Sequence, residues 1–173
     1  MTNQEKYEHT KFIIERFDHY NDSVNNKGSF YIALNTFLLG GLFAGFVSLY
    51  KDIHYGGYLM CLLLGFGVCS LVSIGLTIIA INPFLNSGTK GSRRKSLMFF
   101  GSISEYQKNT YVETFLQQDA DQILNDSLTQ AWVLSTGLTG KYKKLKIAGW
   151  LLIAQFVLMI PIIYYIALNL ISK

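Results

Sequence analysis

Charged residues are missing from three long stretches of this 173-residue sequence. The stretches run from Phe30 to Tyr50, from Gly57 to Pro83 and from Ile147 to Ile171. A helix rises about 1.5 Å per residue, so ~20 apolar residues cross the roughly 30 Å of hydrocarbon in a bilayer. Together with a mean hydropathy of +0.27, this lack of charge argues against a water-soluble core and predicts three transmembrane helices.

Cysteine and histidine are both scarce. Only Cys61 and Cys69 occur, and because they lie about two turns apart on one predicted helix they cannot form a disulfide with each other. The three histidines, His9, His19 and His54, are too scattered to form a metal site or a catalytic triad. We therefore expect no metal and no cofactor, and the sequence predicts that the protein is not an enzyme.

The segment before Phe30 lacks the basic and apolar regions of a cleavable signal peptide, so the first span is expected to act as the insertion signal. Thr2 and Glu5 have the spacing of a capping box. They precede an apolar stripe at helical spacing, formed by Ile13, Phe17, Tyr20 and Val24. Charges of both signs on the opposite face predict an amphipathic cytosolic helix that packs on protein rather than on lipid. This helix can stop or bend near Gly28, or run straight into the first span.

Basic residues cluster on one side of the predicted spans. One cluster, Lys90 to Lys95, follows the second run, and another, Lys141 to Lys146, precedes the third, whereas the connection after Tyr50 is nearly neutral. By the positive-inside rule, the region from Asn86 to Lys146 is cytoplasmic. Three spans then place the N-terminus in the cytoplasm and the C-terminus outside.

The cytoplasmic insert is predicted to be helical after a basic, Ser/Gly-rich linker at residues 86–96. One helix is expected over Ile103 to Gln117, and a second begins near Asp119 or Asp121 and can continue into the third span. The sequence thus predicts an all-α membrane protein. Its four segments are the N-terminal amphipathic helix (1–29), a transmembrane hairpin (30–83), the cytosolic linker and helices (84–145) and the third transmembrane helix (146–173).

Uncharged polar residues interrupt the apolar runs, and they are costly in hydrocarbon unless they are hydrogen-bonded or face water. Gln155 in the third run is therefore expected to point inward. In the second run, Ser70, Ser73 and Thr77 form a stripe that in an oligomer would line an uncharged pore. The alternative is interhelical hydrogen bonding without a pore. The candidate pore-lining residues are Asn35, Ser70, Ser73, Thr77 and Asn82.

Small residues recur every four positions in the hairpin, as at Gly41 and Gly45 in the first run and Gly65 and Cys69 in the second. In membranes such residues let helix backbones approach closely. These faces predict helix contacts within or between subunits. Because three spans are too few to enclose a water path alone, we expect a homo-oligomer in the lipid bilayer.

The two basic clusters have two possible roles. Near lipid headgroups they set the topology and attract anionic lipid. The same side chains can also pair with the phosphates of a cytosolic ligand. The candidate ligand-binding residues are Lys90, Arg93, Arg94, Lys95, Lys141, Lys143 and Lys144.

Three parts of the chain, within about Glu15 to Ile166, contain short motifs of a known pattern. They comprise Glu15, Arg16, Tyr20, Lys27 and Asn35, then Asn82, Pro83, Leu97 to Gly101 and Tyr106, and finally Gln130, Leu134, Ser135, Lys141 and Tyr142. With these motifs the chain resembles the transmembrane effectors of Pycsar antiphage defence and the wider group of small membrane effectors encoded beside nucleotide-making enzymes.

This resemblance implies a bacterial inner-membrane protein that breaches the membrane and arrests growth when a nucleotide signal changes. The nucleotide, made by a neighbouring cyclase or nucleotidyltransferase, is left open. Pycsar effectors respond to cyclic pyrimidine mononucleotides, whereas neighbouring systems use cyclic oligonucleotides or short DNA oligomers, some as inhibitors. No cyclic-nucleotide-binding domain is recognisable, so a ligand must meet the region from Asn86 to Lys146 or the N-terminal helix.

The sequence therefore predicts an oligomeric channel or membrane-disrupting effector under nucleotide control. One alternative is a non-conducting membrane anchor that presents its cytosolic helices to a partner protein. A transporter fits the sequence less well, because the runs contain no charged residue and no inverted repeat.

Overall fold

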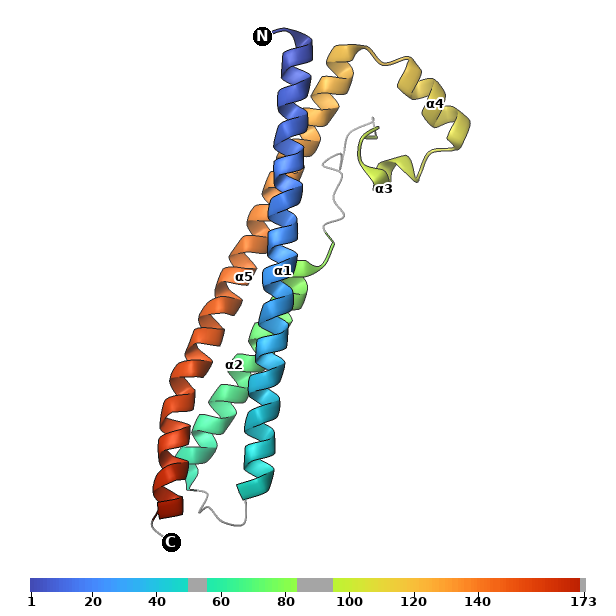
Figure 1. Cartoon of the computed structure of the whole chain (residues 1–173). Coiled ribbons are helices and arrows are strands. Elements are labelled where there is room, and N and C mark those ends of the chain that lie inside the picture. Colours follow the sequence, from blue (N-terminus) through green and yellow to red (C-terminus); the bar gives the residue numbers. More distant parts are fainter. Residues whose placement is uncertain (50–55, 84–94, 172–173) are drawn as a thin grey trace. The chain divides into compact units, whose positions relative to one another are not determined.

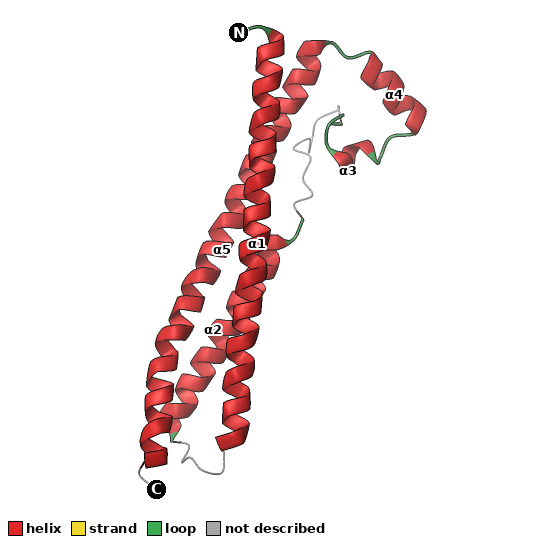
Figure 2. Cartoon of the chain, viewed as in Figure 1, coloured by secondary structure: helices red, strands yellow, loops and turns green. Residues whose placement is uncertain are grey.

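The computed structural model of the protein describes residues 1–49, 56–83 and 95–171. Within these residues the regular secondary structure is all helix, without a strand (Figure 1 and Figure 2). The helices are α1 (Asn3–Leu49), α2 (Gly57–Ile81), α3 (Phe100–Ile103), α4 (Lys108–Leu116) and α5 (Ala120–Ile171). Three of them, α1, α2 and α5, are long and apolar enough to cross a membrane. The predicted all-α fold with three transmembrane helices is confirmed.

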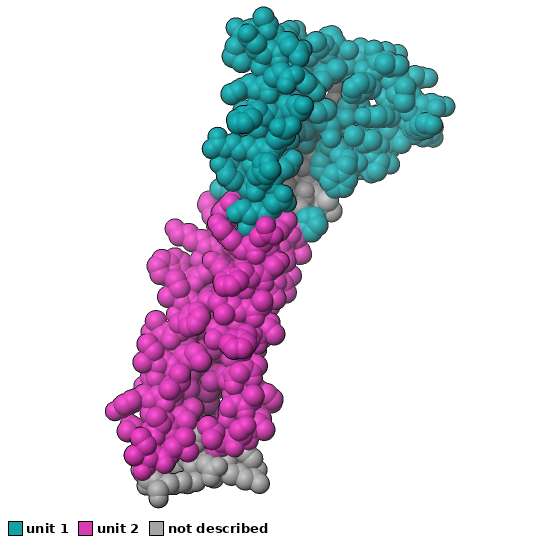
Figure 3. Space-filling model, viewed as in Figure 1, with its two compact units in different colours: residues 1–23, 83–140 teal, residues 24–82, 141–173 magenta. Residues whose placement is uncertain are grey.

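The chain divides into two compact units (Figure 3). Unit 1 comprises Met1–Ser23 and Pro83–Gly140, and unit 2 comprises Val24–Asn82 and Lys141–Lys173. Both α1 and α5 therefore contribute residues to both units, whereas α2 belongs to unit 2 and α3 and α4 belong to unit 1. Unit 2 contains the apolar stretches of all three spans.

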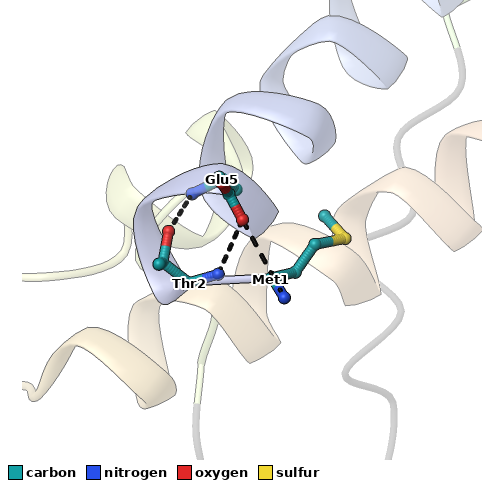
Figure 4. Close-up of polar contacts among 3 residues, drawn as sticks. All are labelled: Met1, Thr2 and Glu5. Carbon is teal, nitrogen blue, oxygen red and sulfur yellow. Dashed lines mark hydrogen bonds and ion pairs between the residues drawn. The ribbon is translucent and has the colours of Figure 1, made fainter.

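The N-terminus of α1 is closed by the predicted capping box (Figure 4). The backbone N–H of Glu5 donates to Oγ1 of Thr2 at 3.2 Å, and the backbone N–H of Thr2 donates to Oε2 of Glu5 at 2.8 Å. The terminal ammonium of Met1 lies 3.9 Å from the same carboxylate oxygen. Two backbone donors that a helix start leaves unpaired are thus satisfied.

Of the two alternatives for Gly28, the uninterrupted helix is the one observed, because α1 continues through this residue. A Cβ atom built on Gly28 would collide with Cγ2 of Ile81, so α1 and α2 approach each other closely here within unit 2. Glycine in a helix costs about 1 kcal/mol relative to alanine. This close approach explains why a residue that favours a helix stop lies inside a helix.

Each long helix of unit 2 buries one seam, in which steps of three and four residues alternate. The seam positions are 24, 28, 31, 35, 38, 42, 45 and 49 on α1, 59, 63, 66, 70, 73, 77 and 80 on α2, and 141, 145, 148, 152, 155, 159 and 162 on α5. A strict repeat of seven residues is typical of helices that cross at a small angle. Outward positions such as Phe37, Leu64 and Val157 are exposed in the single chain and are suited to lipid.

The seams contain an apolar core and a polar level. Leu38 of α1, Leu59 and Phe66 of α2, and Ile162 of α5 form the buried apolar cluster. Each of the three helices also has at least one buried polar residue on its seam, namely Asn35 on α1, Ser70, Ser73 and Thr77 on α2, and Gln155 on α5. The buried polar residues are therefore concentrated at one level of unit 2.

In unit 1, the helix predicted over roughly Ile103 to Gln117 is present only from Lys108 onward, so its predicted start is wrong and its predicted end is confirmed. The structure has α3 ending at Ile103 and α4 beginning at Lys108. In between, the Ser104 hydroxyl donates to the carbonyl oxygen of Gly101, and the N–H of Tyr106 donates to that of Ile103. These local hydrogen bonds compete with a continuous helix.

The predicted start of α5 is confirmed. The N–H of Gln122 donates to Oδ1 of Asp119 at 2.8 Å, and the N–H of Ile123 donates to the Asp119 carbonyl oxygen at 3.2 Å. Asp121 accepts a hydrogen bond from Nδ2 of Asn3 at 2.8 Å, which joins α1 and α5 within unit 1. From Ala120 to Ile171 the helix is unbroken, so the expected continuation into the third span is also observed.

Candidate functional site

Asn35 is the hub of a hydrogen-bonded cluster in the interior of unit 2. Its Nδ2 donates to the Tyr31 carbonyl oxygen at 2.8 Å and to Oγ of Ser73 at 3.2 Å. Its Oδ1 accepts from Oγ of Ser70 at 3.3 Å and from Nε2 of Gln155 at 2.8 Å. One amide of α1 therefore bonds to both other spans. We call Asn35, Ser70, Ser73 and Gln155 the polar cluster.

Hydrogen bonds to the backbone extend the polar cluster along α2 and α5. The Ser73 hydroxyl donates to the Ala148 carbonyl oxygen at 3.0 Å, and the Thr77 hydroxyl donates to the Ser73 carbonyl oxygen at 2.8 Å. At the next residue, a Cβ atom built on Gly149 would lie 2.9 Å from the hydroxyl oxygen of Tyr31. Small residues at Ala148 and Gly149 thus let α5 approach the other two spans.

Gln155 is fully buried, yet its Oε1 has no hydrogen-bond partner among the described residues. A buried polar atom without a partner costs about 1–3 kcal/mol. Among the described residues of unit 2, Oδ1 of Asn25 is the other buried side-chain acceptor without a partner, and Oε1 of Gln155 is the one inside the polar cluster. The apolar surroundings make this acceptor the least satisfied point of the polar cluster.

The structure brings together four of the five candidate pore residues. Asn35, Ser70, Ser73 and Thr77 are all 0% exposed and lie in the interior of unit 2. Asn82 is exposed at the C-terminus of α2 and does not join them. Interhelical hydrogen bonding, the alternative to a pore, describes this arrangement, and pore lining stays a prediction for a different arrangement of the spans.

Gln155 was not among the candidate pore residues, although its inward orientation was expected. The signal that identifies it is its position on the buried seam of α5, seven residues from both Ala148 and Ile162. A polar residue at a seam position of a charge-free run must be hydrogen-bonded inside the bundle. Its partner on another helix cannot be read from that spacing.

The predicted packing residues lie on different surfaces. A Cβ atom built on Gly41 or Gly45 meets no atom within 4 Å, so neither glycine is in a close contact within the described chain. Gly65 lies near Leu158 of α5 at an ordinary contact distance, and Cys69 is half-buried. Contact between subunits through Gly41 and Gly45 stays a prediction.

The candidate ligand-binding cations divide between the two units. Lys95 belongs to unit 1, where its Nζ lies 2.9 Å from a Glu105 carboxylate oxygen and 5.5 Å from the ring centroid of Tyr106. Lys141 belongs to unit 2 and is buried, and this burial, with the nearby charge of Lys144, lowers its pKa below the usual 10.5. The neighbouring Lys143 and Lys144 are exposed, and the predicted Lys90, Arg93 and Arg94 lie outside the described residues.

A family model described as the Pycsar effector protein domain matches residues 9–168. No curated protein and no solved structure matches the chain. The matched region includes the three long apolar helices almost completely, and Pycsar effectors are linked to membranes and to cyclic nucleotide signalling. The chain therefore belongs to the Pycsar effector protein domain family and is a membrane effector of antiphage defence.

Proposed function

We propose that this effector is a homo-oligomeric channel, or membrane-disrupting protein, whose activity is controlled by a cytosolic nucleotide signal and arrests growth. The polar cluster carries this proposal. An anchor requires only apolar spans, and interhelical hydrogen bonds in membranes contribute only about 0.6 kcal/mol each. Here polar side chains from three spans meet at one level, with an acceptor on Gln155 left unfilled. Such groups are suited to replace part of the hydration of water or ions once the spans rearrange.

Conduction through these groups requires more than one subunit. In the single chain the three seams close on one another, and the polar cluster is fully buried. Three helices are too few to surround a water path, so the spans of several subunits must contribute to it. Gly41 is exposed and, like Gly45, has no neighbour within 4 Å of a built Cβ atom. Gly41, which lies off the buried seam that contains Gly45, is therefore available for contact between subunits.

The proposed orientation places the N-terminus and unit 1 in the cytoplasm of a bacterial cell, with the protein in the inner membrane. The basic residues that precede the third span, including the exposed Lys143 and Lys144, support this orientation. A nucleotide made in the cytoplasm would then meet unit 1 directly.

The test removes the hydroxyl groups of Ser73 and Thr77. Leucine at both positions should abolish conductance in planar bilayers and toxicity in cells while the protein stays in the membrane fraction. Because leucine would also crowd the closed bundle, Ser73→Ala with Thr77→Val removes the hydroxyls with little added volume and should lower conductance as well. Val72→Leu, on the exposed face of α2, is the matched control. Unchanged conductance in the Ala/Val variant would refute the pore assignment.

A non-conducting anchor that presents unit 1 to a partner protein is the second candidate. It is favoured by the burial of the polar cluster, since most of its polar atoms are paired within the chain. Expression with a neighbouring nucleotide cyclase separates the two functions. An effector that conducts should depolarise cells, as a voltage-sensitive dye would report, whereas an anchor should leave the membrane potential unchanged.

A further inference from the structure

The outward face of α5 in unit 2 carries a stripe of exposed residues that begins basic and becomes aliphatic. Its positions alternate in steps of three and four residues, so they lie on one face of the helix. In chain order this outward stripe comprises Lys143, Lys146, Trp150, Ile153, Val157 and Ile160. We propose that the outward stripe binds an anionic phospholipid, with its phosphate at the two lysines and an acyl chain on the aliphatic residues. The inference names a lipid partner and depends on neither the channel nor the nucleotide proposed above.

The charges of unit 2 favour an anionic partner. In its described part every charged side chain is a lysine, and the set is Lys27, Lys141, Lys143, Lys144 and Lys146. The described residues of unit 2 therefore offer no carboxylate that could neutralise these lysines. All of them lie within a few residues of the start of a charge-free run, at Phe30 or Ile147. Lysines in this position are attracted to the headgroups of anionic lipids.

A lysine of α1 lies beside the basic end of the outward stripe. Nζ of Lys27 is 5.9 Å from the ring centroid of Tyr142 on α5. Tyr142 precedes Lys146 by four residues, so the two side chains are neighbours on the surface of α5. The exposed Lys27 and Lys146 thus border one region, and they come from two helices of the same unit. A phosphate has several acceptor oxygens and is suited to bind more than one ammonium group.

Trp150 follows Lys146 by one turn and marks the level at which the stripe becomes apolar. Its side chain is 62% exposed, and it forms no hydrogen bond within the described part of the chain. Tryptophan is enriched at membrane interfaces because its ring is apolar while its indole N–H seeks a polar partner. The ester and phosphate oxygens of a phospholipid bound at Lys146 would supply that partner.

The aliphatic part of the stripe matches an acyl chain in length. Ile153, Val157 and Ile160 are at least half exposed. From Lys146 to Val157 the helix rises about 16 Å, at about 1.5 Å per residue, and one leaflet contributes about half of the roughly 30 Å of hydrocarbon. A second copy of the chain fits this face less well. In a two-fold contact the lysines of one stripe would lie against the same lysines of the other and repel them.

Lys144 provides a matched control for the charge of the stripe. It is exposed, as Lys143 and Lys146 are. One residue turns an α-helix by about 100°, so Lys144 points away from the face that Lys143 and Lys146 share. Lys144→Gln therefore removes the same charge at the same end of the span and leaves the outward stripe intact.

The experiment uses the full chain with Trp132→Phe, which leaves Trp150 as its only tryptophan. The protein is reconstituted in phosphatidylcholine vesicles that contain either brominated phosphatidylglycerol or brominated phosphatidylcholine, because bromine quenches the fluorescence of a tryptophan that it touches. Each lysine near the surface contributes about fivefold to anionic lipid binding, so the preference for phosphatidylglycerol at Trp150 should exceed about tenfold. Lys146→Gln should reduce this preference about fivefold, Lys143→Gln with Lys146→Gln should remove most of it, and Lys144→Gln should change it less than about twofold.

Each other outcome overturns the assignment. Equal quenching by the two lipids would exclude a site for anionic lipid. Weak quenching by both lipids would show that protein covers Trp150, as in a contact with another copy of the chain. Equal losses from Lys144→Gln and Lys146→Gln would show a diffuse attraction without a site on the stripe. If inorganic phosphate removes the preference while chloride at the same ionic strength does not, the lysines bind a soluble phosphate instead of a lipid.

Discussion

The two amides of the polar cluster should respond in opposite ways to replacement by leucine. Asn35→Leu removes three hydrogen bonds to other spans, those with Ser70, Ser73 and Gln155. At about 0.6 kcal/mol for each interhelical bond, their loss costs about 2 kcal/mol. The Gln155 amide also loses its partner in an apolar interior, which adds about 1–3 kcal/mol. We therefore expect the free energy of unfolding to fall by about 3–5 kcal/mol.

Gln155→Leu removes a single hydrogen bond, worth about 0.6 kcal/mol. It also removes the buried Oε1 that has no partner in the described residues, and this relieves a cost of about 1–3 kcal/mol. The expected change ranges from neutral to a gain of about 2 kcal/mol. In the variant that carries both Asn35→Leu and Gln155→Leu, no unpaired Gln155 amide remains. The double variant should therefore be at least about 1 kcal/mol more stable than Asn35→Leu alone.

Unfolding by SDS in mixed micelles, followed by the fluorescence of Trp132 and Trp150, measures these differences. Thr36→Leu is the matched control, because Thr36 is exposed beside Asn35 and its hydroxyl bonds only to the Ile32 carbonyl oxygen of its own helix. It should change stability by no more than about 0.5 kcal/mol. If Gln155→Leu costs as much as Asn35→Leu, Oε1 has a partner in the folded state and the reasoning is refuted.

Three further predictions concern other positions. Gly28→Ala should lower the free energy of unfolding by about 1–3 kcal/mol, because its Cβ atom would collide with Ile81. Gly67→Ala is the control in the same SDS assay: its Cβ atom has open space, so the free energy of unfolding should not fall measurably. Gly41→Leu should leave that free energy unchanged but reduce oligomers in native mass spectrometry; unchanged oligomers would exclude this face as the assembly surface. Burial lowers the pKa of Lys141 in the folded protein, so the unfolded chain binds the proton of this ammonium group more tightly. The free energy of unfolding should therefore rise as the pH approaches 10.5 from below, and Lys141→Met should abolish that rise.

The spans and helix starts could be predicted because each depends on local properties of the sequence. A charge-free run long enough for a bilayer is visible residue by residue, and Thr2 with Glu5 satisfies neighbouring backbone groups whatever the rest of the chain does. Asp119 acts in the same local way at the start of α5. The break at Ser104 shows the limit of this reasoning, because a few side-chain and turn hydrogen bonds replaced a helix that the apolar spacing favours.

The polar cluster and the helix contacts depend on which faces meet, and spacing within one helix does not determine this. The small residues Gly41 and Gly45 look like a packing face but have no close neighbour in the described chain. Gly28, which lies in a polar stretch and resembles a helix stop, has the tighter contact with another helix. Likewise, the spacing of Ser73 is compatible with a pore-lining position, whereas in the structure its hydroxyl is hydrogen-bonded to Asn35 and to the Ala148 carbonyl oxygen.

Under the proposed nucleotide control, the strength of the polar cluster determines whether binding of the nucleotide is able to rearrange the spans. Its interhelical bonds are worth about 2 kcal/mol in total, whereas a micromolar ligand binds with about 8 kcal/mol. Reversing an equilibrium from 1:99 to 99:1 takes roughly 5.5 kcal/mol of difference in affinity between two states. The helix α5 is unbroken from Ala120 in unit 1 to Gln155 in the polar cluster, so a ligand of unit 1 would act on the cluster if it preferred one arrangement of α5. Coupling free energies are reciprocal. If the proposed nucleotide control acts through α5, Asn35→Leu should change the affinity for the nucleotide, and the nucleotide should change the effect of Asn35→Leu on the equilibrium of the spans by the same factor.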